Sequence, residues 1–379
     1  MNTPFARGMS RATELTQAGR LDEATALIQS LLNPGAALAA PAPTNDPDVL
    51  EGTFTRSGDS APPAQTTPKA RKGLKDTLRD IAAGGMPKQK LRAPVTPDLP
   101  HGAEFLSLAH AGPSGRREYR LYVPANRRAR DMSLVVMLHG CTQTPEDFAI
   151  GTGMNALAEE FGCLIAYPAQ PQGANAQKCW NWFRPQDQGK GRGEPAVIAG
   201  IVADIVQHYP ADAARVYVAG LSAGGAAAAI MGAAYPEIFA AVGVHSGLPV
   251  GSAQDVASAF AAMRSGSQGR GARLSVPTIV FHGLADATVH PGNGAAVIAQ
   301  ALQSRSGLSI RTDQGRSAGR DYQQTRHIGT DGRSMAEHWE ISGAGHAWAG
   351  GDVRGSYTDP SGPDASRAML GFFLQHKTT

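Results

Sequence analysis

The chain has 379 residues, a formal net charge of +3 and only 6% aromatic residues. This length accommodates one large α/β domain together with an additional segment, and the small net charge argues against a general nucleic-acid-binding role. Three cysteines are too few for a small scaffold held together by disulfide bonds.

The first hundred residues differ from the rest and predict a largely helical and disordered N-terminal extension, 1–100, ahead of a domain at 101–379. Apolar side chains at helical spacing predict a short helical pair at 9–32, which resembles half of a tetratricopeptide array. One such unit cannot bury its apolar face alone. Residues 33–68 are rich in Pro, Ala, Thr and Asp, which is typical of a flexible linker.

Lysine and arginine concentrate in a basic segment at 69–92. Together with Leu74, Leu78 and Ile81, this segment is compatible with binding to an anionic or amphiphilic surface, such as that of a polymer granule. A solvated basic linker explains the same pattern. No nucleic-acid partner is expected, because no recognition motif accompanies the basic residues.

Strands and helices alternate from about residue 103 and predict a mostly parallel sheet. The runs 104–108 and 117–123 flank Gly-Pro-Ser-Gly and predict an opening hairpin. The apolar run 134–138 predicts a buried strand. Two stretches rich in Gly, Ser and Arg, 251–273 and 306–334, are expected to be insertions at the rim of the sheet. Helices are expected at 149–161, 195–208, 223–235, 294–304 and 365–376.

The pentapeptide Gly220-Leu221-Ser222-Ala223-Gly224 is the most informative motif in the chain. Among 45 glycines such a pentapeptide alone is a weak signal, but this one lies between a β-like run at 215–219 and an alanine-rich helical run. A G-x-S-x-G between a strand and a helix is typical of a nucleophile elbow, a strained turn that exposes the serine hydroxyl. Ser222 is therefore the predicted nucleophile, and the backbone N–H of Ala223 is a predicted oxyanion donor.

Two later loops supply the partners that a nucleophilic serine needs. Asp286 follows the predicted strand 276–281 at its C-terminal end, where the catalytic loops of open α/β sheets gather. A turn or helix-capping aspartate is the alternative. His346 lies in a Gly-Ala-Gly-His segment directly after the predicted strand 337–342. We expect Ser222 to attack an acyl carbon, His346 to transfer the proton, and Asp286 to orient the imidazole.

A second oxyanion donor is expected from the loop that follows the run 134–138. The backbone N–H of Cys141 is the candidate, and His139 in the same loop is expected to order the backbone. No spacing of cysteine and histidine typical of a metal site occurs, so neither a metal ion nor another cofactor is expected.

Five motifs together resemble a known family of esterases. They are LHGCTQTPEDF at 138–148, CWNWF at 179–183, GLSAGG, HGLAD and GAGHAW, and they resemble the polyhydroxybutyrate depolymerase family, whose α/β-hydrolase members are related to feruloyl and acetylxylan esterases. The resemblance covers roughly residues 103–376. It implies an α/β-hydrolase fold with the triad and oxyanion donors named above.

The resemblance also implies that Cys141 and Cys179 form a disulfide bond, whereas two reduced thiols are the alternative for a cytoplasmic enzyme. The scarce aromatic residues gather in the same motifs. Trp180, Trp182 and Trp348 are predicted to contact an apolar polyester or aryl ester, and ordinary packing beneath the loops is the alternative.

The predicted function is a serine esterase that hydrolyses 3-hydroxyalkanoate polyester or oligomers through an acyl-enzyme. The alternative is a feruloyl, acetylxylan or general short-chain carboxylesterase, since the same triad serves each. A third hypothesis, a granule-associated scaffold protein, does not account for the intact triad. No signal peptide or transmembrane segment is recognisable, so a cytoplasmic location is expected. An extracellular location, as in many members of the family, is the alternative.

Overall fold

The computed structural model describes residues 96–127, 131–267, 269 and 273–378. The helical pair predicted at 9–32, the linker at 33–68 and the basic segment at 69–92 lie outside these described residues. The domain boundary expected at residue 100 stays a prediction. Among the described residues, no helix is both long and apolar enough to cross a bilayer.

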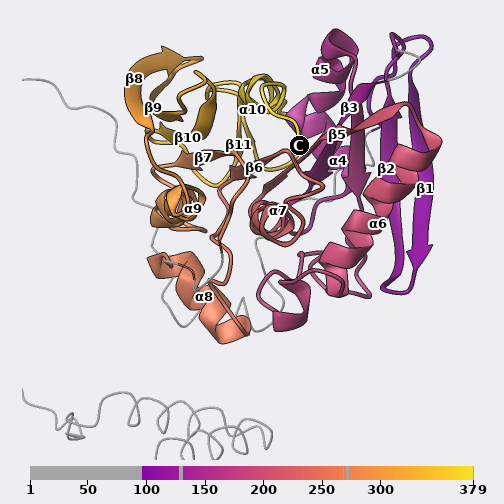
Figure 1. Ribbon diagram of the computed structural model, residues 1–379, viewed down its shortest axis with the longest axis horizontal. Helices are drawn as coiled ribbons and strands as arrows, with labels where there is room; N and C mark the ends of the chain where they lie inside the picture. The colour runs from indigo at the N-terminus through magenta and orange to yellow at the C-terminus, as the bar shows by residue number, and fades with distance from the viewer. Residues whose placement is uncertain (1–95, 128–130, 268, 270–272, 379) are drawn as a thin grey trace, which may run out of the picture. The chain divides into compact units, whose positions relative to one another are not determined.

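The described residues form an α/β structure around a ten-stranded sheet with helices on both faces (Figure 1). The strand order is β1-β2-β4-β3-β5-β6-β7-β10-β9-β8, and the six central strands from β4 to β10 pair in parallel. The strands are β1 (Glu104–Gly112), β2 (Gly115–Val123), β3 (Met132–Leu138), β4 (Leu164–Pro168), β5 (Ala211–Leu221), β6 (Ala241–His245), β7 (Thr278–Gly283), β8 (Ser309–Ser317), β9 (Arg320–Ile328) and β10 (Ser334–Ile341).

Two apolar cores lie on opposite faces of this sheet. One includes side chains of α6, α7 and α9, and the other includes side chains of α4, α5 and α10. The helices are α4 (Pro145–Thr152), α5 (Met154–Phe161), α6 (Gly193–His208), α7 (Ala223–Ala234), α8 (Val256–Ser265), α9 (Gly292–Leu302) and α10 (Ala365–Phe373), with a 3-10 turn, η1, at Pro185–Asp187. A short parallel pair, β11 (Trp348–Ala349) and β12 (Thr358–Asp359), follows β10.

The predicted parallel sheet and opening hairpin are confirmed, and the structure adds to or differs from the expected elements at four places. The single helix expected at 149–161 is divided at Gly153, which has a left-handed φ of 62° that glycine adopts without steric cost. The stretch 251–273 contains α8, and 306–334 contains the hairpin of β8 and β9, which extends the sheet. Strand β6 was not expected at all.

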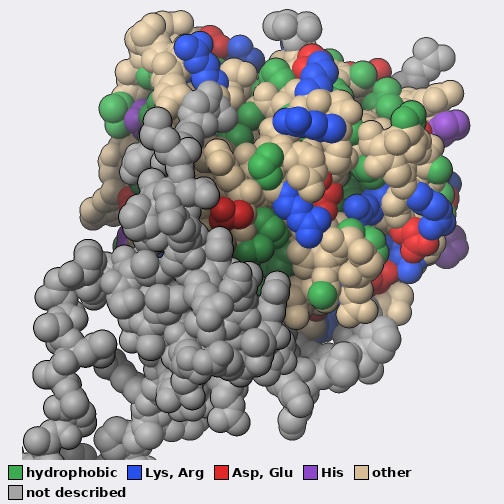
Figure 2. Space-filling view, turned by 90° about the horizontal axis from the view of Figure 1, so that it is seen from below, with side chains coloured by type: hydrophobic (Ala, Val, Ile, Leu, Met, Phe, Trp, Pro, Cys, Tyr) green, Lys and Arg blue, Asp and Glu red, His purple; other side chains and the backbone are tan. Residues whose placement is uncertain are grey.

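The surface carries charges of both signs. On the face shown in Figure 2, basic and acidic side chains are interspersed and do not form one large patch of a single sign. This agrees with the small net charge of the chain.

Candidate active site

Ser222 occupies the turn between β5 and α7, as the sequence predicts for a nucleophile elbow. Its backbone has φ 59° and ψ −119°. This conformation is strained for any residue that carries a side chain, and such strain is often found at functional sites. The turn is held from below, because the Ser222 N–H donates to the carbonyl oxygen of His245 over 2.9 Å. This hydrogen bond attaches the elbow to the C-terminal end of β6.

Glycine is required on both sides of the serine by close approach of backbone. A Cβ atom at Gly224 would overlap the carbonyl oxygen of Leu138 and lie 2.6 Å from that of His139. A Cβ atom at Gly220 would overlap the backbone of Gly224. The first turn of α7 thus lies directly against the end of β3, and this contact brings the elbow beside the loop that follows β3.

Replacing Gly224 with alanine is expected to lower kcat by about 10²-fold, because the added methyl group must push the elbow away from β3 and a displacement of about 1 Å is that costly. Overpacking of this kind also destabilises, typically by about 1–3 kcal/mol. Gly371→Ala is the matched control, since its added Cβ meets nothing within 4 Å. Equal kcat in the two variants, measured on a p-nitrophenyl ester, would contradict the expectation.

The loop after β3 presents unpaired backbone donors beside the elbow. Gly140 N–H donates to Gln143 Oε1 over 2.8 Å, and Thr142 N–H donates to the carbonyl oxygen of Gln177 over 2.7 Å. Between them, the N–H of Cys141 has no acceptor within the described part of the chain, and the same holds for the N–H of Ala223 at the start of α7. These are the two amides that the sequence predicts for the oxyanion hole.

His139 orders this loop, as expected from the sequence. It is buried, and its Nε2 accepts a hydrogen bond from the Gln170 N–H over 3.1 Å. Its Nδ1 lies 2.7 Å from the carbonyl oxygen of Gly140, and its own carbonyl accepts from Trp180 Nε1 over 3.1 Å. Burial lowers the pKa of His139 to about 4, so the ring stays neutral and Nε2 remains an acceptor.

A disulfide bond between Cys141 and Cys179 is present, which confirms the pairing that the family resemblance implies. It joins the loop after β3 to the segment that carries Trp180. Glu194 on α6 anchors the same segment, because its buried carboxylate accepts from the backbone N–H of Asn181 over 2.8 Å and from its Nδ2 over 2.7 Å. Burial raises the pKa of Glu194.

Replacing Cys179 with serine is expected to lower both stability and kcat. The bond closes a loop with a sequence separation of 38, and chain entropy for such a loop gives a stabilisation of about 4 kcal/mol. The loss in kcat should be up to about 10²-fold, because Cys141, the partner of Cys179 in the bond, carries a predicted oxyanion donor. Denaturant unfolding and steady-state kinetics measure the two effects. Cys163→Ala, which leaves the bond intact, is the control, and a Cys179→Ser variant matching it in both would overturn the expectation.

Asp286 and His346 are brought together by the loops that follow β7 and β10. His346 Nδ1 lies 2.7 Å from Asp286 Oδ2. The other carboxylate oxygen accepts from the N–H groups of Thr288 and Val289, each over 2.9 Å. Burial acts to raise the pKa of Asp286, but hydrogen bonds from His282 and His346 outweigh it and hold that pKa well below its usual range. The carboxylate is therefore charged at neutral pH.

The two loops are also joined through their backbones. Leu284 N–H donates to the carbonyl oxygen of Ile341 and Ala285 N–H to that of Ala344, each over 2.9 Å. Arg320, at the tip of the β8–β9 hairpin, donates to the carbonyl oxygen of Gly343 over 2.7 Å. Since β7 and β10 are adjacent parallel strands, their carboxyl ends place both loops at the same edge of the sheet.

The Ser222 hydroxyl and the His346 ring make no hydrogen bond with each other within the described residues. Such catalytic hydrogen bonds are often long without substrate and shorten in the Michaelis complex. The structure thus brings together the acid with the base, and the elbow with the oxyanion loop.

The structure corrects the expectation that Trp180 and Trp348 contact the substrate. Trp180 is 0% exposed and Trp348 is 1% exposed, and Trp182 is also buried. The Nε1 atom of Trp348 donates to Ser366 Oγ over 3.0 Å, while Trp182 packs edge-to-face on Phe183. The tryptophans therefore support the loops from beneath, which was the packing alternative.

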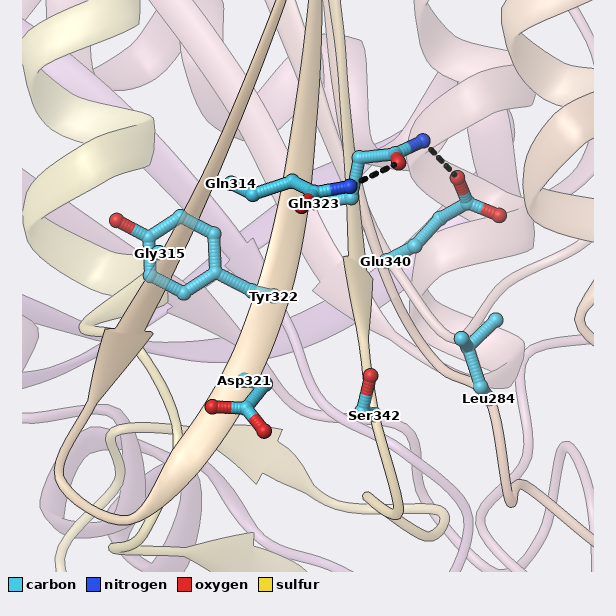
Figure 3. Close-up of a pocket in the computed structure, with 8 residues that line it drawn as sticks. All are labelled: Leu284, Gln314, Gly315, Asp321, Tyr322, Gln323, Glu340 and Ser342. Atoms are coloured by element: carbon cyan, nitrogen blue, oxygen red, sulfur yellow. Dashed lines mark hydrogen bonds between the residues drawn. The ribbon is translucent and has the colours of Figure 1, made fainter.

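A polar cavity that sequence reasoning missed is lined by residues of β8, β9 and β10 and by Leu284, which lies two residues before Asp286 in the chain (Figure 3). Its volume is about 710 Å³. Gln314 Nε2 donates to Gln323 Oε1 over 3.4 Å, and Gln323 Nε2 donates to Glu340 Oε2 over 3.5 Å. No motif marks these residues in the sequence. The lining residues are Leu284, Gln314, Gly315, Asp321, Tyr322, Gln323, Glu340 and Ser342.

Proteins with similar sequences include a depolymerase and an esterase. The poly(3-hydroxyalkanoate) depolymerase C of Paucimonas lemoignei is 32% identical over 243 residues, which are 59% of this chain and 57% of that protein. A probable acetylxylan esterase A of Aspergillus fumigatus is 30% identical over 204 residues, 48% of this chain and 53% of that protein. The chain thus spans little more than half the length of these two relatives.

A solved structure and a family model complete the comparison. The acetyl xylan esterase from Aspergillus awamori superposes with a TM-score of 0.53 at 22% identity, covering 72% of this chain and 99% of that one, which shows the shared fold. Residues 117–323, more than half of the chain, match the family model described as esterase PHB depolymerase. The protein therefore belongs to the PHB depolymerase family of esterases, carboxylic ester hydrolases with an α/β-hydrolase fold.

Proposed function

We propose that this esterase hydrolyses 3-hydroxyalkanoate esters, as polyester or oligomers, through a covalent acyl-enzyme on Ser222. The observation that carries the mechanism is the 2.7 Å hydrogen bond between Asp286 and His346 at the edge of the sheet where Ser222 stands in its strained turn. The choice of substrate is supported by the similarity to a poly(3-hydroxyalkanoate) depolymerase.

In the first half of the reaction, Ser222 Oγ attacks the ester carbonyl carbon while His346 Nε2 takes its proton. The carbonyl oxygen becomes an oxyanion, which accepts hydrogen bonds from the N–H groups of Cys141 and Ala223. The tetrahedral intermediate then breaks its bond to the leaving alcohol, and His346 returns the proton to that oxygen. The products are an acyl-enzyme and a free alcohol.

In the second half, a water molecule attacks the acyl carbon as His346 takes one of its protons. Collapse of the second tetrahedral intermediate breaks the bond to Ser222 Oγ, which receives the proton from His346. The carboxylic acid leaves. Throughout both halves, the charged Asp286 accepts from His346 Nδ1, which fixes the tautomer and stabilises the imidazolium.

Release of soluble 3-hydroxybutyrate products from amorphous polyhydroxybutyrate granules tests this proposal. Wild type should release products, and a Ser222→Ala variant should release them about 10⁶-fold more slowly. A short p-nitrophenyl ester serves as the activity control. Hydrolysis of the short ester without any release from granules or from hydroxybutyrate oligomers would retain the mechanism and reject this substrate.

The polar cavity favours a second candidate function, hydrolysis of acyl groups carried on a hydroxyl-rich carbohydrate. Hydroxyl groups both donate and accept, so they can pair with the carboxylate of Glu340 and with the carboxamides of Gln314 and Gln323. A polyester chain offers only acceptors along its length. If this candidate is right, Glu340→Ala raises KM for acetylated xylooligosaccharides about tenfold and leaves kinetics on p-nitrophenyl acetate unchanged. Equal KM in variant and wild type would reject it.

A further inference from the structure

His245, at the end of β6, contacts both loops that must meet during catalysis. Its carbonyl oxygen accepts from the Ser222 N–H over 2.9 Å. Its side-chain Nε2 accepts from the N–H of Ala349 over 2.9 Å. Ala349 lies three residues after His346, in the short strand β11. One residue therefore holds the turn of the predicted nucleophile with its backbone and the segment behind the predicted base with its ring.

The surroundings of His245 fix both the position and the protonation of this ring. The ring is 1% exposed and lies against two aromatic rings, Trp348 at 5.0 Å between centroids and Phe281 at 5.8 Å. Burial, reinforced by His282 and His346, lowers the pKa of His245 to about 3. The ring is thus neutral, and because Nε2 accepts from Ala349, the proton is on Nδ1, which lies 3.2 Å from Ser246 Oγ.

We propose that His245 is a positioning residue that sets the distance between Ser222 and His346. This inference rests on the proposed triad. Since the ring cannot reach solvent, it makes no contact with substrate and takes no part in proton transfer. Its lone pair on Nε2 holds Ala349, and through the intervening residues it fixes where the His346 ring stands above the elbow.

The chemistry of this role makes a specific demand on the side chain. It must present a neutral hydrogen-bond acceptor at the position of Nε2, and it needs neither acid nor base strength. Glutamine carries its Oε1 the same number of bonds from Cα as Nε2 of histidine. Asparagine carries its Oδ1 as far out as Nδ1, too short to reach Ala349. Both variants carry polar, neutral side chains, and only glutamine can place an acceptor at the position of Nε2. Comparing His245→Gln with His245→Asn therefore tests whether that acceptor is what the role requires.

The experiment measures kcat and KM of the full chain on a p-nitrophenyl ester. The concentration of active enzyme is determined by titration with an organophosphate that reacts covalently with the catalytic serine. His245→Asn should lower kcat by about 10²-fold, the cost of displacing a catalytic group by about 1 Å, with KM changed less than about threefold. His245→Gln should restore kcat to within about tenfold of wild type. Phe281→Leu, which removes one stacked ring and leaves the hydrogen bond to Ala349, should keep kcat within about threefold.

Two outcomes would overturn the proposal: equal kcat in the Gln and Asn variants, or a loss in Phe281→Leu as large as in His245→Asn. An equal loss in both His245 variants, or the large loss in Phe281→Leu, would mean that the ring acts through packing alone. Ser222→Ala, assayed in parallel, separates this failure from failure of the proposed function. If Ser222→Ala retains activity, the triad itself is wrong. If it is inactive while both His245 variants match wild type, only the positioning role is rejected.

Discussion

Replacing Ser222 with alanine is expected to lower kcat for ester hydrolysis by about 10⁶-fold, as for the nucleophiles of other catalytic triads. The loss is this large because every later step depends on the covalent bond that Ser222 forms. The residual rate should still exceed that of the uncatalysed reaction by about 10³–10⁴-fold, since the oxyanion donors and the binding surface remain. Initial rates on a p-nitrophenyl ester at high enzyme concentration measure both numbers.

Ser252→Ala is the matched control for this substitution. The Ser252 hydroxyl is buried without a hydrogen-bond partner in the described part of the chain, so its removal should leave both the fold and the activity intact. A Ser222→Ala variant that folds normally by near-ultraviolet circular dichroism and retains more than about 1% of kcat would reject the triad. That result would favour the hypothesis of a granule-associated scaffold protein.

Replacing Asp286 with asparagine should lower kcat by about 10⁴-fold with little change in structure. The asparagine side chain keeps the shape of Asp286 but replaces one acceptor with an amide that cannot accept from His346 Nδ1. The imidazole then favours the wrong tautomer, and no negative charge stabilises the imidazolium. Kinetics at pH 7 measure the loss, and an effect smaller than about tenfold would show that Asp286 has only the capping role that the sequence left open.

The depressed pKa of Asp286 also predicts how this variant responds to pH. A carboxylate whose pKa is lower in the folded state stabilises the fold above the pKa of the unfolded chain, about 3.9, and this contribution is lost as pH falls toward the folded value. The difference in free energy of unfolding between wild type and Asp286→Asn should therefore be constant from pH 5 to 8 and shrink below about pH 4. A difference that grows on acidification would contradict the assignment.

The sequence predicts the parts of the site that have local signals. Ser222 lies in a motif whose glycines are demanded by backbone contacts at Gly220 and Gly224, and Asp286 and His346 each follow an apolar strand. His245 has no such signal, because β6 is a short apolar run and its two hydrogen bonds join residues distant in the chain. Only the sheet order brings them together.

The tryptophans show why composition was misleading. Aromatic residues beside the catalytic motifs suggested contact with the substrate, yet Trp180 and Trp348 each have a buried N–H that needs an acceptor. The carbonyl oxygen of His139 accepts from Trp180, and the hydroxyl of Ser366 on α10 accepts from Trp348. The β8–β9 hairpin was missed for a different reason. Its strands are polar and partly exposed on both faces, so they lack the alternation of apolar and polar residues by which strands are recognised.

Arg320 at the tip of that hairpin makes the position of His346 depend on an element that opens easily. The hairpin lies at the edge of the sheet and buries few apolar side chains, so it belongs to the elements that open locally at low free-energy cost. Arg320 nevertheless holds the carbonyl oxygen of Gly343 and the carboxylate of Asp359, on either side of His346 and β11. On heating, fraying of this edge would release the base while the rest of the sheet remains folded, and the enzyme would lose activity before it loses structure.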